Sequence, residues 1–341
     1  MKRILTFLLA LTMILSLCAC GTVKETEKET SAEAVQTEYP LTVTDQAGRS
    51  VTIEAEPQRL VSGYYISTSL LIALDLDQKL VGVEAKADKR AIYKLSAPAL
   101  IELPNVGTAK EFDLEGCLAL NPDLVILPIK LKSAAETLEQ MNIDVILVNP
   151  ESQALLNEMI KIVSKATNSQ DRAEMLFAFT AAREAMLAAK LENAAKPRVY
   201  LAGNSALLST AGNAMYQHSM IEAAGGANVA GDIADTYWVN IDYEQLLAWD
   251  PEYIILASDA SYTCEDVLKD PNLANCRAVK EGKVYQMPNV AEAWDSPVPS
   301  GVLGSVWLAS VLHSELISAE EAQDTITKFY EQFYGFAYPH A

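Results

Sequence analysis

The apolar residues of this chain follow two periods that alternate along the sequence. Short apolar runs typical of buried strands are separated by stretches in which apolar residues recur every three or four positions, as in helices. The strand-like runs are 59–62, 80–83, 123–127, 144–148, 198–201, 253–256 and 284–287. The helix-like stretches include 113–119, 133–141, 152–166, 218–224, 242–248, 299–313 and 319–333. This alternation predicts mostly parallel sheets with flanking helices.

The longest helical stretch is Asn168–Ala195, which contains no Gly or Pro and is rich in Ala, Leu, Met, Glu, Lys and Arg. These residues lose little on entering a helix. Asn168 or Ser169 is suited to cap its start, and Pro197 prevents its continuation. Such a helix is about 40 Å long. The apolar stripe that we expect to be buried consists of Met175, Phe179, Ala182, Met186 and Ala189.

The segments on either side of this helix contain an internal repeat. Asp113–Leu127 aligns without a gap with Asp242–Leu256, 129 positions later. Both copies begin Asp-x-Glu, continue through Leu, Ala and Pro, and end on a strand-like run that closes with Leu. A shared helix, turn and strand indicates a duplicated design. The fold class predicted is therefore α/β, with two Rossmann-like lobes joined by one long interlobe helix.

The first twenty residues resemble a bacterial lipoprotein leader. Lys2 and Arg3 precede an apolar run, 4–17, that is too short to span a bilayer. The run ends Leu17-Cys-Ala-Cys20-Gly, in which Cys20 fits the lipobox pattern and Cys18 fits it poorly. The resemblance implies cleavage before Cys20 and acylation of that residue, which anchors the protein to the cell membrane. The alternative is an ordinary secretory leader with incidental cysteines.

These features divide the chain into a leader at 1–19, a charged flexible tether at 20–38, an N-terminal lobe at 39–167, the connecting helix at 168–195 and a C-terminal lobe at 196–341. The tether is rich in Thr and Glu and lacks aromatic residues, which is typical of a segment without a packed core. An alternating pattern at 41–53, interrupted by a turn at 45–48, predicts a β-hairpin at the start of the first lobe.

Composition narrows the classes of function. Half of the residues are hydrophobic and the formal net charge is −19, or −21 once Lys2 and Arg3 are removed with the leader. So acidic a chain does not fit a nucleic-acid partner. The only histidines are His218, His313 and His340, in positions that do not suggest a shared metal ion, and no Cys/His spacing typical of zinc is present. Cofactors and structural metals are not expected.

Three cysteines lie in the expected folded part of the chain. Cys117 falls in an apolar helical pattern, so we expect it to be buried. Cys264 and Cys276 would lie outside the cytoplasm, where disulfides are stable. The sequence leaves open whether these two form a disulfide or remain two free thiols.

The chain resembles the substrate-binding lipoproteins of ABC importers that carry ferric siderophores, haem and cobalamin, a family whose lobes are hinged by a single helix. The resemblance covers nearly everything after Tyr39. It is carried by the lipobox at Cys20 and by 45–49, 57–62, 118–125, 223–229, 278–285 and 307–313. It implies an extracytoplasmic, lipid-anchored monomer, not an enzyme, that binds an iron complex or a corrinoid between its lobes. It also implies delivery to the permease dimer of an ABC importer.

Ligand contacts are expected beyond the carboxyl ends of the parallel strands. This rule selects Tyr64, Tyr65 and the loops 86–94, 128–132, 149–150, 203–205, 258–259 and 289–296. Within these loops, the candidate contacts are Lys130, Asn204, Trp294 and Asp295. The resemblance adds Lys110 and Trp238. Trp238 stands where the cobalamin binder of the family carries a Trp in its pocket, whereas Ala109 stands where that binder has a second Trp. The cations Lys86, Lys89, Arg90, Lys94, Lys110, Lys130 and Lys132 follow strands of the first lobe. They form either a solvated face or the contact for an anionic ligand group.

Glu115 and Glu244 occupy the same repeat position, each in the first turn of a short helix. The helix dipole favours an acid there, but this local role does not explain why both lobes keep it. The resemblance implies that these two glutamates, as in the family, lie on the outer rim and dock into arginine pockets of the importer. Such charges set encounter rate and register.

Other classes of protein fit the sequence less well. A hydrolase would need a Gly-x-Ser-x-Gly elbow, and a nucleotide-binding enzyme a Walker or Gly-x-Gly-x-x-Gly loop, and neither occurs. A zinc or manganese binder would need converging histidines. A purely structural adhesion lipoprotein would have no ligand cleft. Among ligands, a ferric siderophore leads, followed by a corrinoid, haem, or an oxyanion of the molybdate or tungstate type.

Overall fold

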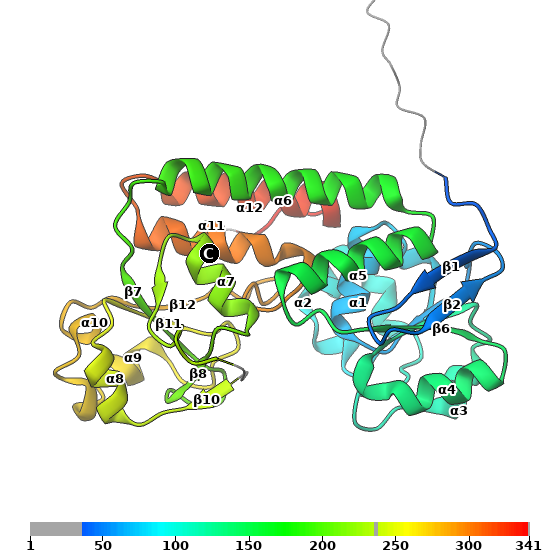
Figure 1. The fold of residues 1–341 in the computed structure, drawn as a ribbon, viewed down its shortest axis with the longest axis horizontal. Coiled ribbons are helices and arrows are strands. Elements are labelled where there is room, and N and C mark those ends of the chain that lie inside the picture. Colours follow the sequence, from blue (N-terminus) through cyan, green and yellow to red (C-terminus); the bar gives the residue numbers. More distant parts are fainter. Residues whose placement is uncertain (1–35, 235–237, 340–341) are drawn as a thin grey trace, which may run out of the picture. The chain divides into compact units, whose positions relative to one another are not determined.

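The first lobe is built on a four-stranded parallel sheet. In the computed structural model, which describes residues 36–234 and 238–339, this sheet has the order β4-β3-β5-β6. Its strands are β3 (Leu60–Ser62), β4 (Leu80–Gly82), β5 (Leu124–Pro128) and β6 (Asp144–Val148). The helices are α1 (Tyr65–Ala73), α2 (Ala91–Ser96), α3 (Leu114–Ala119), α4 (Lys132–Gln140) and α5 (Gln153–Ala166). The predicted hairpin, β1 (Leu41–Thr44) with β2 (Ser50–Ile53), packs beside β6 and α5 (Figure 1).

The second lobe repeats this plan around a second parallel sheet of order β12-β11-β7-β9. Its strands are β7 (Arg198–Ala202), β9 (Ala227–Asn228), β11 (Tyr253–Leu256) and β12 (Val284–Gln286). An antiparallel pair, β8 (Ser209–Ala211) with β10 (Trp238–Asn240), lies beside it. The helices are α7 (Tyr216–Ala223), α8 (Tyr243–Trp249), α9 (Cys264–Leu268), α10 (Arg277–Lys280), α11 (Val302–Leu312) and α12 (Ala319–Tyr334). The predicted α/β class with two parallel sheets is confirmed.

The consecutive apolar residues of the strands are explained by burial on both faces of each sheet. On β5, Leu124 and Ile126 join one hydrophobic cluster, whereas Val125 and Leu127 join another on the opposite face. The second lobe shows the same alternation, so that Tyr200 of β7 faces away from its neighbours Val199 and Leu201. Strands β3, β5, β6, β7 and β11 therefore have helices or loops against both faces, as their sequences predicted, whereas β12 at the edge of its sheet is buried only at Val284.

The connecting helix α6 spans Gln170–Leu191, which is shorter than the predicted 168–195. Asn168 adopts a left-handed backbone with φ of 56°, and Ser169 takes the N-cap position without a side-chain cap. The predicted buried stripe is displaced. Met175 is 44 % exposed, and the buried residues are instead Ala173, Leu176 and Leu187. Phe179 and Met186 are only partly buried, because α6 rests against α5, α7 and α11 along a neighbouring face.

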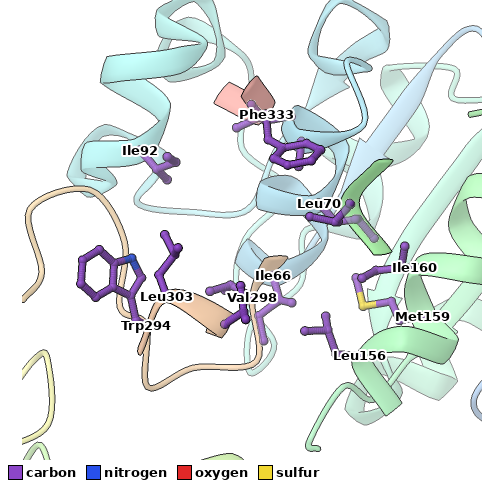
Figure 2. Packing of buried hydrophobic residues seen from close by; sticks show 14 of the residues in the cluster. Ile66, Leu70, Ile92, Leu156, Met159, Ile160, Trp294, Val298, Leu303 and Phe333 are labelled. Carbon is purple, nitrogen blue, oxygen red and sulfur yellow. The ribbon is translucent and has the colours of Figure 1, made fainter. Parts of the chain in front are cut away.

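The end of the chain returns from the second lobe to the first. Helix α12 packs against α1 and α11, and the Tyr334 and Ser69 hydroxyls are 2.9 Å apart. Arg172 of α6 donates to the carbonyl of Gln332 at 2.7 Å. Figure 2 shows α1 side chains such as Ile66 in one cluster with Val298 and Phe333 from the last part of the chain. The residues predicted as a C-terminal lobe, 196–341, thus include a helix that also covers the first lobe.

The internal repeat has the same geometry in both lobes. Asp113 and Asp242 are the N-caps of α3 and α8, and their carboxylates accept from backbone N–H groups three residues later at 2.9 and 2.8 Å. The same repeat position just after each helix has positive φ, at Asn121 with 46° and at Asp250 with 42°. These matching details support one helix, turn and strand design used twice.

An arginine at the start of a central strand holds the end of each repeated helix. The guanidinium of Arg59 donates to the carbonyls of Leu120 and Asn121 at 2.5 and 2.9 Å. Arg198 donates twice to the carbonyl of Trp249, at 3.1 and 2.5 Å. Last-turn carbonyls have no partner within a helix, so the same need is met in the same way in both lobes.

Several short elements had no strong pattern in the sequence. Helices α2, α9 and α10 and strands β8 and β10 were not predicted, because each has few residues and depends on its neighbours for stability. No helix within the described residues has both the length and the apolar character needed to cross a bilayer. The predicted leader and Cys20 lie outside the described residues.

Candidate functional site

Polar and aromatic side chains gather where the parallel strands of the two sheets end. Tyr64 and Tyr65 follow β3, and the cationic segment 86–94 follows β4. From the second lobe, Asp259 follows β11 and the loop 289–296 follows β12. Ligands of open α/β sheets bind at this edge, so the two lobes bring their candidate contacts to the same place.

A cavity of about 190 Å³ lies between these segments. The first lobe provides its wall through 65 and 89–93, and the second lobe through 259 and 289–296. The polar and aromatic side chains of the lining are Tyr65, Lys89, Arg90, Tyr93, Asp259, Asn289, Glu292 and Ser296. We call this space the interlobe cavity. It has cations on the wall from the first lobe and carboxylates on the wall from the second.

Arg90 is the central cation of the interlobe cavity. Its guanidinium lies over the ring of Tyr65 at 4.3 Å from the centroid, and Tyr65 meets Tyr64 edge-on at 5.3 Å. Across the described part of the chain, this guanidinium makes no hydrogen bond and no ion pair, whereas exposed Lys89 pairs with Asp88 at 2.9 Å. An arginine carries five donors in a planar fork that matches an oxyanion or carboxylate. Arg90 is therefore a stacked, half-buried cation that lines the cavity and has donors of the kind that bind anions.

Buried hydrogen bonds fix the first-lobe wall of the cavity. Tyr93 of α2 is fully buried and donates to the carboxylate of Glu84 at 2.6 Å. The other oxygen of Glu84 accepts from Thr68 of α1, also at 2.6 Å. Burial raises the pKa of Tyr65, while the nearby charge of Arg90 opposes this shift. The phenols of this wall are thus neutral at neutral pH and act as hydrogen-bond donors.

The second-lobe wall carries two further carboxylates. Glu292 is 8 % exposed and accepts a short hydrogen bond from Ser300. Asp259 is exposed and accepts one from the side-chain amide of Asn289. Because Asp259 and Asn289 come from loops after neighbouring strands, this bond ties together the two segments that form the wall.

A smaller cavity of about 70 Å³ is lined only by residues of the first lobe. It is lined by Tyr64 and Lys130, both predicted as ligand contacts, together with Ala109, Asn149 and Glu151. The structure therefore brings Tyr64 and Lys130 together. Tyr65 lies in the larger cavity instead, so the two neighbouring tyrosines face different spaces.

Trp294 and Asp295 do not line the cleft as the sequence predicted. Trp294 is 1 % exposed, and its indole N–H donates to the Tyr330 hydroxyl at 2.8 Å. Asp295 is 4 % exposed, and its carboxylate accepts from the backbone N–H of Ser258 at 3.0 Å. The prediction placed the whole loop in the cleft, but Tyr330 of α12 covers Trp294, and Ser258 and Gln217 hold Asp295 inside the second lobe. Their role here is to hold the loop that presents Glu292.

Three other predicted contacts remain apart from both cavities. Lys110 and Asn204 are exposed and line neither space. Trp238 is 40 % exposed on β10, opposite Ala211 of β8. Its ring lies against Gly203, where an added Cβ would stand 2.9 Å from it. Gly203 directly follows β7, so Trp238 is close to the edge at which the strands end.

The sequence did not single out Arg90, it selected Glu292 and Ser296 only as members of the loop 289–296, and it missed Tyr93 and Glu84. Arg90 was one of seven cations that the pattern could not rank. Tyr93 and Glu84 occur in an irregular stretch without an apolar period, so nothing in the sequence indicated their contact. Glu292 and Ser296 were indicated only by the position of the loop 289–296, which follows a strand.

The two predicted docking glutamates lie on the repeated helices. Glu115 and Glu244 are exposed and stand in the first turns of α3 and α8. An open groove of about 540 Å³ runs beside Glu244 and is also lined by Asn240, Gln245 and Ala248. Neither glutamate lines the interlobe cavity.

The cysteines and histidines contribute no further site in the described ranges. Cys117 is buried, as predicted, and Cys264 and Cys276 are both free thiols. His313 is buried and lies 3.2 Å from the carbonyl of Gly225. No group of three His, Cys, Asp or Glu side chains within residues 36–234 and 238–339 is placed to hold a metal ion.

Comparisons with known proteins agree with this geometry. The molybdate-binding protein MolA of Haemophilus influenzae is 27 % identical over 87 % of this chain and 91 % of its own length. The structure of MolA bound to molybdate superposes with a TM-score of 0.76 at 25 % identity, covering 88 % of this chain and 99 % of that one. The vitamin B12-binding protein of Salmonella choleraesuis is 27 % identical over 49 % of this chain and 64 % of its length.

These relatives are solute-binding proteins and not enzymes. Their likeness extends over both lobes and the connecting helix in the case of MolA. The family model described as periplasmic binding protein matches residues 60–291, which include both parallel sheets and the lining of the interlobe cavity as far as Ala291. This chain therefore belongs to the periplasmic binding protein family, as a solute-binding component for ABC import.

Proposed function

We propose that this protein captures a small oxyanion of the molybdate or tungstate type in the interlobe cavity and delivers it to an ABC importer. The observation that carries this proposal is the guanidinium of Arg90, stacked on Tyr65 between the lobes and without a carboxylate partner in the described structure. An oxyanion supplies the acceptor oxygens that such a fork binds in pairs. The 27 % identity to a molybdate-binding protein supports the same ligand class.

The size of the cavity favours a small solute over the iron complex that the sequence ranked first. Sites for drug-sized ligands usually enclose about 300–1,000 Å³, and a corrinoid or haem belongs at or above that range. The interlobe cavity encloses about 190 Å³. A larger ligand would require the two walls to separate, whereas an oxyanion fits between Arg90 and the side chains already present.

The proposal is tested by a thermal-shift and calorimetric screen of the purified protein with molybdate, tungstate, sulfate, phosphate, ferric siderophores, cobalamin and haem. We expect molybdate or tungstate to stabilise the protein by about 2.7 kcal/mol at one hundred times the dissociation constant. Arg90→Met should abolish this effect, since truncating a desolvated charged anchor costs about 2–5 kcal/mol. Lys94→Met, which removes an exposed cation of the same segment, is the matched control and should bind normally. Strong binding by Arg90→Met would disprove the assignment.

The second candidate is a planar iron chelate or a corrinoid, and the exposed ring of Trp238 favours it. A half-exposed indole beside Gly203 offers a stacking surface near the strand edge. Stacking of this kind is worth about 0.5–1.5 kcal/mol. If this candidate is correct, haem, cobalamin or a ferric siderophore should quench tryptophan fluorescence, and Trp238→Ala should weaken binding of that ligand. Binding of molybdate alone, with no response to Trp238→Ala, would eliminate it.

Delivery and anchoring complete the proposed role. Glu115 and Glu244 dock onto a permease dimer, one from each lobe, as a monomer of this protein engages the importer. Acylation of Cys20 holds the protein at the outer face of the cell membrane through the tether. Cys20→Ser should release the protein into the medium or periplasm, whereas Cys18→Ser should remain in the membrane fraction. Equal membrane association of both variants would refute anchoring through Cys20.

A further inference from the structure

Two buried glutamates, one from each lobe, flank the interlobe cavity. Glu292 lines the cavity directly and is 8 % exposed. Glu84 is 6 % exposed and lies behind Tyr93, which lines the cavity and donates to it. Neither carboxyl forms an ion pair with Arg90 in the part of the chain that the structure describes. Two buried acids thus share one cation, which is itself oriented toward the cavity.

Arg90 stabilises the ionised form of both acids. Burial raises the pKa of Glu292 and of Glu84, because a buried charge loses its hydration. Hydrogen bonds from Ser300 to Glu292 and from Thr68 and Tyr93 to Glu84 oppose this shift, and so does the positive charge of Arg90. An anion bound to Arg90 would cancel that charge and repel both carboxylates.

We propose that the binding of an anion at Arg90 is coupled to the uptake of one proton. A carboxylate of the pair Glu292 and Glu84 takes up this proton from water, so that the pair controls the net charge that the cavity accepts. This inference rests on the proposed binding of an oxyanion in the same cavity. The uptake forms one O–H bond on a carboxylate, chiefly that of Glu292, and breaks the bond that held this proton in hydronium or in the buffer acid, while the solute keeps all of its bonds. Because linkage is reciprocal, anion affinity falls as the pH rises and these carboxyls ionise.

The remaining groups around the pair do not take over this role. The phenols that face it are Tyr65 of α1, Tyr93 of α2 and Tyr330 and Tyr334 of α12, and burial raises the pKa of each. They stay protonated across the neutral range. Lys89 and Asp88 pair with each other in solvent, and exposed Asp259 is bonded by Asn289. Burial also raises the pKa of Asp295, but this side chain does not line the interlobe cavity, and its carboxylate accepts from the backbone N–H of Ser258.

The experiment is calorimetric titration with molybdate at several neutral pH values, each in two buffers of different ionisation enthalpy. The wild-type protein should take up protons on binding, and its affinity should fall with pH, by up to about tenfold per unit if one full proton is linked. Glu292→Gln should reduce the uptake, flatten the pH dependence and tighten binding at the alkaline end. Glu84→Gln should do the same more weakly, since it lies behind Tyr93.

Glu222→Gln is the matched control, because Glu222 lies on α7, pairs with Lys196 and lines neither wall of the cavity. It removes the same charge and should keep the wild-type proton uptake. Molybdate binding without proton uptake, or with uptake unchanged in both glutamine variants, would overturn the inference while leaving the proposed function intact.

A second measurement needs no solute. Loss of the Arg90 charge, in Arg90→Met or Arg90→Gln, should raise the titration midpoint of Glu292. This midpoint is measured by carboxyl ¹³C NMR, and the Glu292 resonance is assigned by its absence in Glu292→Gln. An unchanged midpoint would also overturn the inference. Failure of molybdate to bind wild-type protein, with a shifted midpoint, would instead refute only the proposed oxyanion.

Discussion

The two lobes are alike where their central strands begin and differ where those strands end. At the amino ends, Arg59 and Arg198 each hold the last carbonyls of a short helix that an aspartate caps. At the carboxyl ends, the first lobe presents cations, with Arg90 foremost, whereas the second presents the carboxylates of Asp259 and Glu292. One design therefore supports two walls of opposite charge.

This difference indicates which parts of the duplicated design are constrained by folding. A helix terminus needs its orphan backbone groups satisfied wherever it occurs, so caps and arginine contacts recur in both lobes. The loops after the strands have no such common need and are free to carry binding groups. The exceptions are Glu115 and Glu244, which recur although they are exposed and bond to nothing in the described structure. Their symmetry supports a shared external partner.

Charge reversal of both glutamates should prevent docking at both lobes and give the largest of the effects described below. Glu115→Lys with Glu244→Lys is expected to reduce solute import through the cognate importer by tenfold or more, because like charges then face each other across the interface. Each single reversal should do part of this damage, and raised salt should change it. Import is measured in cells, and solute affinity by calorimetry on the purified variant.

The matched control for docking reverses two exposed glutamates elsewhere, Glu102→Lys with Glu192→Lys, which makes the same change in net charge. This control should import normally. Unchanged import by the Glu115 and Glu244 double variant, at normal expression, would refute docking through these residues. Lost solute affinity in that variant would also count against it, because neither residue lines the interlobe cavity.

Removal of the arginine contacts tests whether Arg59 and Arg198 contribute equally to the stability of their lobes. We expect Arg59→Met and Arg198→Met each to lower the free energy of unfolding by about 1–2 kcal/mol, since each removes charge-assisted bonds to helix carbonyls. The losses, measured by denaturant unfolding, should be similar in the two lobes. Lysine at either position should restore only part of the lost unfolding free energy, because its side chain lacks the planar fork of arginine. A loss confined to one lobe would show that the second contact is incidental.

Removal of the caps should give the smallest of these effects. Asp113→Ala and Asp242→Ala should each cost about 1 kcal/mol of unfolding free energy, because one N–H of the first turn loses its acceptor. Asn at either position keeps an acceptor and is the control, with a loss of a few tenths of a kcal/mol at most. Thermal unfolding of the four variants measures this. An alanine variant as stable as the wild type would mean that solvent replaces the cap.

The alternation of strands and helices, the hairpin, the connecting helix and the repeat were all predictable from the sequence, because each depends on contacts between near neighbours. A strand buried on both faces needs consecutive apolar residues, and an aspartate three residues before a backbone N–H can cap it. The boundaries of α6 and its buried face were less well predicted. Ala, Leu and Met occur all around this helix, so its neighbours decide which side is covered.

Period, strand direction and repetition in the sequence are enough to predict the two-lobed plan, the edge at which a ligand is expected and the paired glutamates. Which side chains line the interlobe cavity depends instead on tertiary contacts. Trp294 became a core residue because α12 returns across the chain and supplies Tyr330 as its partner. Arg90 was distinguished from the other cations only by its position over Tyr65. Both outcomes depend on contacts between residues far apart in sequence, which no local pattern records.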